Sequence, residues 1–216
     1  MASAAGQPLL IVGCGGHAKV VSDVAKALGY ADQAFIDTTA SASTFQGRTV
    51  SHHLPRGYGG LFFIAVGTNA IRQDLYHAFL AANPSASSPA LVHPSSVIGS
   101  ACSIAAGSVV MPLCVVNAGS RIAPGVIINT RSSVDHDCHL MEFSSLAPGC
   151  VLAGGVSVGQ RSALGLASAV CHRIVIGDDV VVGGASFVNR DLEARSVAYG
   201  SPARQVRSRL TSDPYL

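Results

Sequence analysis

The sequence predicts a small N-terminal α/β domain with a parallel, Rossmann-like sheet, followed by an all-β parallel β-helix. Three observations lead to this prediction. Aliphatic residues recur at every sixth position from Ile98 to Val188. A column of small residues runs two positions ahead of them. Before this repeat, short apolar segments alternate with helix-like segments, which is typical of βαβ units.

The hexapeptide repeat has a simple physical interpretation. A period of six fits neither an α-helix nor a flat two-faced strand. It fits a three-sided coil in which each hexapeptide is a short strand plus a corner, so that about 18 residues complete one turn. Stacked turns would pair their strands in parallel around one continuous core. Sixteen aliphatic positions, enough for about five turns, form the column: Ile98, Ile104, Val110, Val116, Ile122, Ile128, Val134, Leu140, Leu146, Leu152, Val158, Leu164, Val170, Ile176, Val182 and Val188.

Small residues precede this column and turn-forming residues follow it. Two positions before the aliphatic residue, fifteen of sixteen residues are Ser, Cys or Val, which we expect to pack near the corners. Four of the six cysteines are thereby core residues, and the absence of a CxxC pair argues against a zinc ribbon. The residue after the aliphatic one is often Gly or Asn, which we expect to permit the bend: Gly99, Asn117, Asn129, Gly159, Gly165, Gly177, Gly183 and Asn189.

The N-terminal part is predicted to be a parallel sheet with helices. Residues 9–12, 35–36 and 61–66 are expected strands, and residues 20–28 and 71–80 are expected helices. The divisions we expect are a nucleotide-sugar-binding domain over 1–92, a β-helix over 93–195 and a C-terminal tail over 196–216. The break falls at His93, because the proline that follows disfavours helix there.

A glycine-rich turn joins the first strand to the first helix. Gly13-Cys14-Gly15-Gly16 places backbone N–H groups and a helix N-terminus where they could face a phosphate. Asp37 follows about 20 residues later, where an acid can bind a ribose hydroxyl. The alternative is a tight turn that needs glycine only for its backbone.

Composition narrows the classes of function. The 216 residues carry a net charge of +2 without a basic stripe, so nucleic acid and anionic membrane are not expected partners. No segment approaches the roughly 20 apolar residues of a membrane span, and no basic segment of a signal peptide opens the chain. We therefore expect a cytoplasmic protein. Only 12% of residues are charged, which suggests that much surface is hidden or that the protein oligomerises.

The chain resembles a known family over nearly its whole length. The unbroken hexapeptide array resembles the hexapeptide-repeat acyltransferases, which are left-handed β-helices and usually homotrimers with active sites between subunits. Residues 11–21 and 63–72 resemble the sialic acid O-acetyltransferase and nucleotide-amino-sugar N-acetyltransferase family, in which this domain holds a nucleotide-linked amino sugar. His17 has a simpler alternative as a helix cap. By matching motifs, the resemblance implies these substrate-binding residues: Gly13, Cys14, Gly16, His17, Asp37, Gly67, Asn69 and Arg72.

The corner at His136 is the expected site of catalysis. Acyl transfer needs a base near neutral pH, for which histidine is the first choice. Residues 128–138 resemble the family's catalytic stretch, which implies that His136 is the general base and that Asp137, where the family often has Glu, orients it. Gly154 lies one turn later, and the resemblance makes its N–H an oxyanion donor. The alternative is a solvated corner histidine.

Acetyl-CoA is the cosubstrate that the resemblance implies. Small residues in later turns would let pantetheine approach, and residues 197–204 resemble the G-x-P-A-K/R motif that closes many hexapeptide transferases. Arg204 would then pair with a phosphate. The expected CoA-binding residues are Gly154, Gly155, Gly165, Gly183, Gly184 and Arg204.

The function expected from the sequence is transfer of acetyl from acetyl-CoA to the amino group of a UDP- or GDP-linked 4-amino-4,6-dideoxy sugar. Such sugars are of the perosamine or bacillosamine type, and the thioester is attacked directly. The alternatives are a sialic-acid-type O-acetyltransferase and a non-catalytic regulatory partner in a sugar pathway. A zinc enzyme of the γ-class carbonic anhydrase type would need His136, His139 and His172 to converge. Since His172 is expected roughly 10 Å from His136, no metal is expected.

Overall fold

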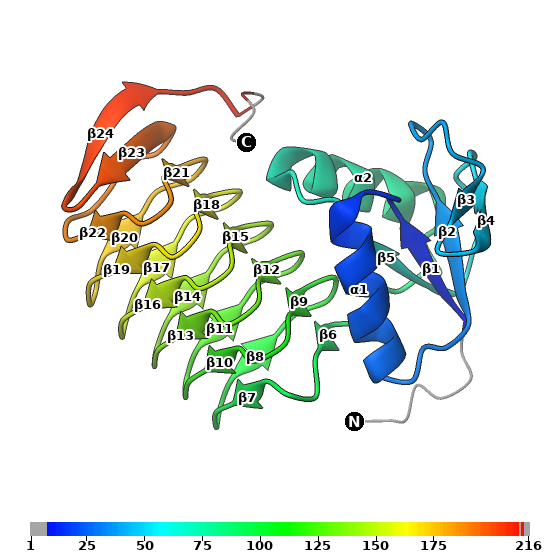
Figure 1. The fold of residues 1–216 in the computed structure, drawn as a ribbon, viewed down its shortest axis with the longest axis horizontal. Coiled ribbons are helices and arrows are strands. Elements are labelled where there is room, and N and C mark those ends of the chain that lie inside the picture. Colours follow the sequence, from blue (N-terminus) through cyan, green and yellow to red (C-terminus); the bar gives the residue numbers. More distant parts are fainter. Residues whose placement is uncertain (1–7, 212, 214–216) are drawn as a thin grey trace.

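The computed structural model describes residues 8–211 and 213. The N-terminal domain is a five-stranded sheet of order β3-β4-β2-β1-β5, with β1 parallel to both β2 and β5 (Figure 1). The alternation of strands and helices predicted from the sequence is confirmed. Its elements are β1 (Leu9–Val12), α1 (Gly16–Ala27), β2 (Gln33–Ile36), β3 (Thr44–Phe45), β4 (Arg48–Ser51), β5 (Leu61–Ile64) and α2 (Asn69–Ala82).

The β3–β4 hairpin was not predicted from the sequence. Its two-residue turn places both Gln46 and Gly47 at positive φ, at 48° and 75°, which is the requirement of a tight hairpin turn. Only Gly47 is a typical residue there. Neither α1 nor α2 is long and apolar enough to cross a membrane, and the described part of the chain holds no other candidate span.

The second domain is a three-faced parallel β-helix, as predicted. One face has six strands: β7 (Val97–Ile98), β10 (Val115–Val116), β13 (Ser133–Val134), β16 (Val151–Leu152), β19 (Ala169–Val170) and β22 (Phe187–Val188). Another has five: β8 (Ser103–Ile104), β11 (Arg121–Ile122), β14 (His139–Leu140), β17 (Ser157–Val158) and β20 (Val175–Ile176). The third has eight: β6 (Leu91–Val92), β9 (Val109–Val110), β12 (Ile127–Ile128), β15 (Ser145–Leu146), β18 (Ala163–Leu164), β21 (Val181–Val182), β23 (Ser196–Gly200) and β24 (Ala203–Ser208).

The hexapeptide repeat fixes the register of these faces. Each strand pairs with the strand 18 residues later, as Val134 does with Leu152 and Leu152 with Val170. From Val110 to Val188 the aliphatic column is buried, and so is the column of small residues from Ser108 to Ser186. Buried serines of this column donate hydrogen bonds to backbone carbonyls, as Ser120 Oγ does to Asp135 O at 2.8 Å. Their hydroxyl groups are therefore satisfied inside the core.

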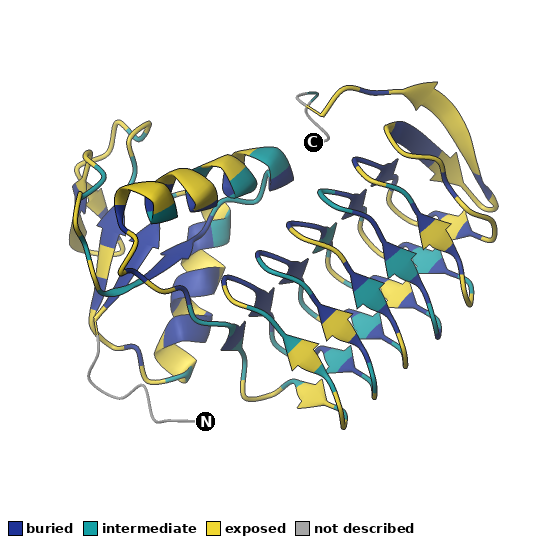
Figure 2. Ribbon diagram, turned by 180° about the vertical axis from the view of Figure 1, so that it is seen from behind, coloured by how far each residue is buried: buried dark blue, intermediate teal, exposed yellow. Residues whose placement is uncertain are grey.

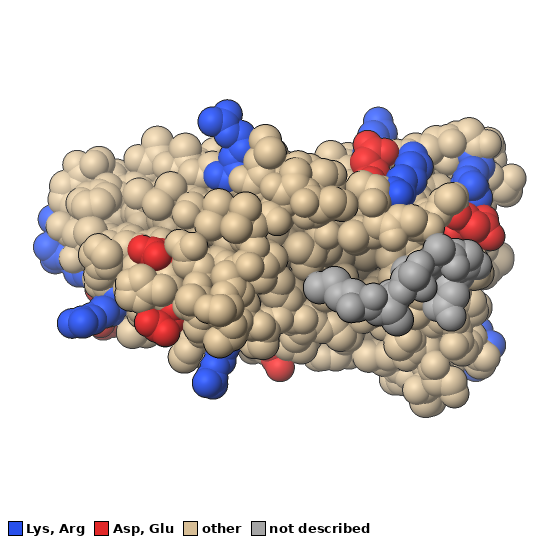
Figure 3. Space-filling model, turned by 90° about the horizontal axis from the view of Figure 1, so that it is seen from below, with Lys and Arg blue, Asp and Glu red and all other residues tan. Residues whose placement is uncertain are grey.

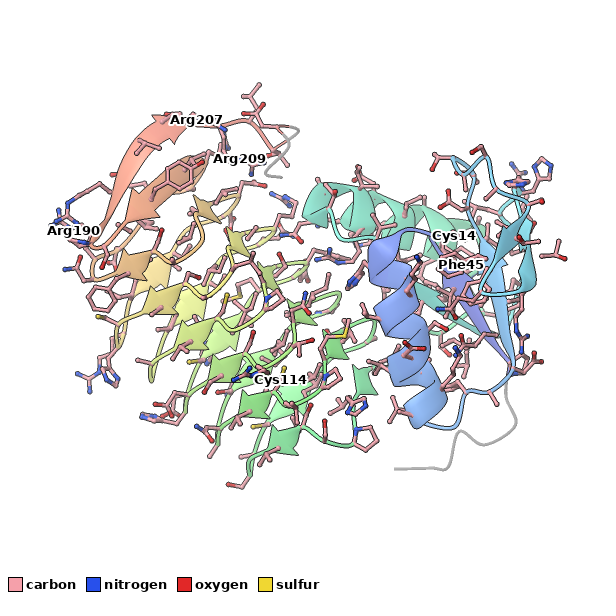
Figure 4. All side chains as sticks on the ribbon, viewed as in Figure 1. Cys14, Phe45, Cys114, Arg190, Arg207 and Arg209 are labelled. Carbon is pink, nitrogen blue, oxygen red and sulfur yellow. The ribbon has the colours of Figure 1, made fainter. Side chains whose placement is uncertain are left out.

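The cysteines occupy the places expected of core residues. Cys114, Cys138 and Cys150 are buried in the interior of the β-helix, and all six cysteines are free thiols. Figure 4 labels Cys114 among the side chains of the β-helix and Cys14 at the start of α1 in the other domain. The spacing of Cys114, Cys138 and Cys150 therefore follows the hexapeptide repeat and not a disulfide framework.

The mechanism expected for the corners needs a correction. The residues at positive φ lie three positions after the aliphatic residue, not one, and many are not glycine: Leu113, Arg131, Asp137, Phe143, Arg161, Ala167, Arg173, Asp179 and Ala185. The glycine directly after the aliphatic residue has another purpose. A Cβ at Gly99 would lie 2.6 Å from Ala118 N, so glycine allows successive turns to approach closely there.

The β-helix begins and ends with strands outside the hexapeptide column. β6 pairs with β9, so the eight-stranded face starts at Leu91, within the range assigned to the first domain. In the segment predicted as a tail, β23 pairs in parallel with β21 and then turns back into the antiparallel β24 (Figure 1). This hairpin covers the C-terminal end of the β-helix.

The two domains lie side by side with the eight-stranded face toward the N-terminal domain. Figure 2 shows the strands of this face that lie opposite the N-terminal domain mostly in the colour of buried residues, and β9, β12, β18 and β21 are buried at both positions. The C-terminal strand β24 of the same face is exposed, and the strands of the other two faces carry exposed and intermediate positions. The outward residues Ile127 and Ala163 are each 5% exposed. The face drawn in Figure 3 is dominated by uncharged residues, consistent with the low charged content of the chain.

Candidate active site

The corner after β13 carries a histidine–aspartate pair. His136 Nδ1 lies 2.8 Å from Asp137 Oδ2, and the His136 backbone N–H donates to Asp135 Oδ1 at 2.8 Å. Asn117 Nδ2 donates to the same Asp135 oxygen at 3.1 Å. With Nδ1–H donated to Asp137, the Nε2 of a neutral imidazole keeps its lone pair, as a general base requires.

Two glycines make room for this pair. A Cβ at Gly119 would lie 2.6 Å from Asp137 Oδ1, and a Cβ at Gly154 would overlap the His136 Nε2. The imidazole therefore lies directly over Gly154, one turn further along the β-helix. Among the described residues, no backbone or side-chain acceptor bonds the Gly154 N–H. The His136 imidazole and an unused amide donor are thus adjacent, as the 18-residue spacing predicts.

The electrostatics of this corner favour protonation of the histidine. The pKa of His136 is raised above its ordinary value, first by the hydrogen bond to Asp137 and then by the Asp135 carboxylate, while Arg173 opposes the rise. The pKa of Asp135 is lowered by the bonds from His136 N and Asn117. The neutral, proton-accepting form of His136 is therefore reached at a higher pH than that of an unperturbed histidine.

A cavity of about 600 Å³ opens at this corner and extends toward the C-terminal turns. It brings together four of the predicted site residues: His136, Asp137, Gly154 and Gly155. His172 and Arg173, one turn beyond Gly154 and Gly155, complete its lining. Neither His172 nor Arg173 was among the predicted site residues, although each follows a predicted glycine by 18 residues.

A second cavity, of about 500 Å³, lies on a different corner. It follows the ends of β12, β15, β18 and β21, and it brings together the predicted residues Gly165, Gly183 and Gly184. Two residues of the N-terminal domain, His17 and Gly67, also line this cavity. Tyr199 also lines this cavity, and its ring packs directly on Gly183; it was not among the predicted site residues.

His17 is held neutral at the edge of this second cavity. Burial, and then the positive charge of Arg72, lower the pKa of His17 to about 4. Its Nε2 is buried without a hydrogen-bond partner among the described residues. No side-chain cap bonds the start of α1, so the alternative of a capping histidine does not describe this residue. Its unpartnered nitrogen is available to a ligand.

The glycine-rich turn and Asp37 are bonded to each other. Cys14 N donates to Asp37 Oδ2 at 2.9 Å, and Asp37 Oδ1 accepts from Thr39 and Ala40. Partial burial opposes these hydrogen bonds, yet the pKa of Asp37 stays below its ordinary value. Burial and then Asp37 raise the pKa of the Cys14 thiol to about 11. Gly13 sits at φ 111°, with Ala65 O 3.0 Å from the place of a Cβ, whereas Gly16 begins α1 in open space.

The structure places Asn69 and Arg72 inside the protein, and not at an open surface. Arg72 is 1% exposed, and its five N–H donors reach Gly125 O, Phe143 O, Val66 O, Gly67 O and Asn69 Oδ1. Asn69 Nδ2 donates to Arg161 O and Ser162 O. These two side chains join α2 to the corners of the β-helix. They hold the domains together and leave no guanidinium donor for a substrate.

Two other predicted residues lie apart from the cavities. Arg204 is an exposed residue of β24 whose Nη1 donates to Ala203 O at 2.8 Å, and it lines neither cavity. His139 lies on β14, away from His136 and His172. Within the described residues, no group of three His, Cys, Asp or Glu side chains is arranged to hold a metal ion.

Comparisons with known proteins agree with this architecture. Residues 8–79 match the PglD N-terminal domain family. The acetyltransferase domain of PglB from Neisseria gonorrhoeae FA1090 superposes with a TM-score of 0.86 at 31% identity, over 93% of this chain and 100% of that domain. PerB from Caulobacter crescentus, solved with CoA and GDP-perosamine, gives 0.86 at 34% identity over 94% of this chain and 99% of PerB.

A curated relative matches over a shorter segment. A chloramphenicol acetyltransferase from Agrobacterium fabrum is 31% identical over 72 residues, so the chain spans about a third, 34%, of that relative. These structural matches, which cover more than nine-tenths of the chain, define a hexapeptide-repeat acyltransferase with a small α/β N-terminal domain. The chain belongs to the hexapeptide-repeat family of amino-sugar N-acetyltransferases that includes the PglB domain and PerB, and it is an acyltransferase.

The raised pKa of His136 is directly measurable. We expect its imidazole to titrate in NMR above the ordinary value of 6.5, because the charged form is stabilised by Asp137. Asp137→Ala removes that carboxylate, so the pKa should fall toward the ordinary value. The matched control is Asp178→Ala, an exposed acid on another corner, which should leave the titration unchanged. An unchanged His136 titration in Asp137→Ala would contradict the pairing described here.

Proposed function

We propose that this protein transfers acetyl from acetyl-CoA to the amino group of a nucleotide-linked 4-amino-4,6-dideoxy sugar, with UDP or GDP as the nucleotide. The observation that carries the proposal is the position of His136 Nε2 directly over Gly154, whose backbone N–H has no hydrogen-bond acceptor among the described residues. The other ring nitrogen, Nδ1, is hydrogen-bonded to Asp137. Support comes from relatives: the PglB domain was solved with acetyl coenzyme A, and PerB with CoA and GDP-perosamine.

The geometry suits direct transfer without a covalent enzyme intermediate. His136 Nε2 accepts a proton from the sugar amine as the amine nitrogen attacks the thioester carbonyl carbon. The carbonyl oxygen becomes an oxyanion, which the Gly154 N–H stabilises by a hydrogen bond. The C–S bond then breaks, and the CoA thiolate takes the proton from the imidazolium, which Asp137 has held in orientation. An amide and free CoA are the products.

The arrangement of the two cavities supports a site shared between subunits. Within one protomer, the corner that carries His136 and the corner lined by Gly165 and Gly183 are separated by the six-stranded face. That face exposes an apolar row, with Val97 62%, Val151 48% and Phe187 40% exposed. Packing this face on a neighbour in a homotrimer would bury the row and bring one subunit's base to the next subunit's groove.

The acceptor nucleotide belongs at the glycine-rich turn. The turn at residues 13–16 precedes α1, and His17 lies at the edge of the second cavity with an unpartnered nitrogen. Backbone N–H groups at a helix start suit the diphosphate of the acceptor. Free cysteines throughout the chain suit the reducing cytoplasm, where we place the enzyme.

The proposed reaction is tested by thiol release from acetyl-CoA with a panel of UDP- and GDP-linked amino sugars. We expect release with at least one amino sugar, and His136→Ala should lower kcat by roughly 10²- to 10⁴-fold, the usual contribution of a general base. His139→Ala, a histidine of the same β-helix outside both cavities, is the matched control and should keep wild-type turnover. Near-normal turnover in folded His136→Ala would overturn the assignment of the base.

The shared site is tested by mixing two inactive variants. His136→Ala removes the base, and Gly184→Phe fills the groove at an exposed glycine. Each variant alone should be inactive. Trimers reassembled from a one-to-one mixture should regain about a quarter of wild-type activity, because about one interface in four then joins two intact halves. No regained activity in trimers that are shown to be mixed would mean that base and groove serve the same protomer's site.

A further inference from the structure

A third cavity, of about 600 Å³, lies on the remaining corner of the β-helix. This corner joins the five-stranded face to the eight-stranded face, because Arg161 stands between β17 and β18 and Asp179 between β20 and β21. The start of α2 and the segment after β24 also line the cavity. It meets the proposed acyl-transfer site only at the loop before α2, where Gly67 lines the second cavity and Thr68 the third.

The first turn of α2 presents unused backbone donors to this cavity. The N–H groups of Ala70 and Ile71 precede the first one that bonds back along the helix, and no side chain caps them. Among the described residues, neither group has an acceptor. The first turn also contains no acidic side chain. These donors and the helix dipole together favour a negatively charged group in the cavity.

A buried arginine is a second, independent indication of a ligand. Arg209 lines the same cavity and is 6% exposed, and its Nε is buried without a hydrogen-bond partner among the described residues. Figure 4 labels Arg209 just beyond β24, on the side of the hairpin toward α2. Its other nitrogens are used, since Nη1 donates to Asp179 O at 3.0 Å and Nη2 to Asp213 O. An unmet donor on a buried cation is costly, so an acceptor at Nε would stabilise the folded protein.

The other charges of the cavity restrict the kind of anion. The Asp179 carboxylate is neutralised by Arg161, whose Nε and Nη2 donate to its two oxygens at 2.8 and 2.6 Å. One oxygen of the Asp213 carboxylate accepts from the Leu210 N–H at 3.0 Å, and Asp74 is exposed. Two cations and three carboxylates therefore line the cavity. Carboxylates in this excess repel a dianion such as phosphate more strongly than they repel a monoanion.

Two aliphatic side chains line the cavity together with these polar groups. Ile71 is 51% exposed and Leu210 is 67% exposed, and they come from α2 and from the segment after β24. Apolar side chains with a few convergent polar groups are typical of a pocket for a small organic molecule. A ligand with a short apolar chain would cover both side chains while its charged end bonds α2 and Arg209.

We propose that this third cavity binds a small organic monocarboxylate. One carboxylate oxygen accepts from the N–H groups at the start of α2, the other accepts from Arg209 Nε, and the aliphatic part lies between Ile71 and Leu210. The site is separate from those proposed for acetyl-CoA and for the nucleotide sugar, because it lies on a different corner of the β-helix. It therefore takes its ligand whether or not an amino sugar is the acceptor of the acyl group.

The test uses butyrate as the probe and NMR of the isotope-labelled full chain as the readout. In the wild-type protein, the Ala70 amide and the Arg209 Nε–H signals should shift saturably. Ile71→Asp places a carboxylate in the first turn of α2, where it competes for the same donors, so butyrate affinity should fall about tenfold. Because Ile71 is exposed, the substitution removes no core packing. Arg209 is left intact, since its Nη donors also hold the segment after β24.

Two control variants separate charge from position. Ile71→Asn is the uncharged counterpart and should keep butyrate affinity within about threefold, because it loses only part of the apolar contact. Ser103→Asp adds the same charge at an exposed position of β8, outside the cavity, and should leave binding unchanged.

Four results would overturn the proposal. They are the absence of a saturable shift, an equal affinity of Ile71→Asp and wild type for butyrate, shifts confined to residues 13–17, and tighter binding of inorganic phosphate than of butyrate. Shifts at residues 13–17 would assign the anion to the glycine-rich turn, and tighter phosphate binding would assign the cavity to a dianion. None of these measurements depends on turnover, so they stand apart from the test of the acyl transfer.

Discussion

The structure depends on one constraint, which is that an aliphatic side chain must fill the interior of the β-helix at every sixth residue. Because side chains alternate across a strand, a shift of one residue would turn each buried aliphatic residue outward. The repeat therefore keeps successive turns 18 residues apart in register. This register places Gly154 beneath His136 and brings His172 into the same cavity. Catalytic geometry thus follows from core packing.

The two domains contribute different parts of the proposed site. The β-helix supplies the His136–Asp137 pair and the two cavities on its corners, while the N-terminal domain supplies a glycine-rich turn and a neutral His17. Their relative position is fixed by Arg72, a buried guanidinium that bonds carbonyls of both domains. A buried charge of this kind persists only when all its donors are satisfied, which the five acceptors achieve. These hydrogen bonds therefore fix the N-terminal domain against the corners of the β-helix.

Local periodicity explains what the sequence could predict. The β-helix, its buried cysteines and the meeting of His136 with Gly154 all follow from counting in steps of six and 18 residues. Arg72 could not be placed in this way, because its role depends on Gly125 and Phe143, which are distant in the chain. The partners of Asp37 were also hidden, since they belong to a turn whose backbone folds onto the carboxylate.

The most direct measurement is a crystal structure of the oligomer with acetyl-CoA and an unreactive acceptor analogue. The account predicts the thioester carbonyl oxygen within about 3 Å of Gly154 N, the acceptor nitrogen position beside His136 Nε2, and the donor lying between that corner and the Gly165–Gly183 groove of a neighbouring subunit. A donor bound away from Gly154, or both substrates held within a single protomer, would contradict it.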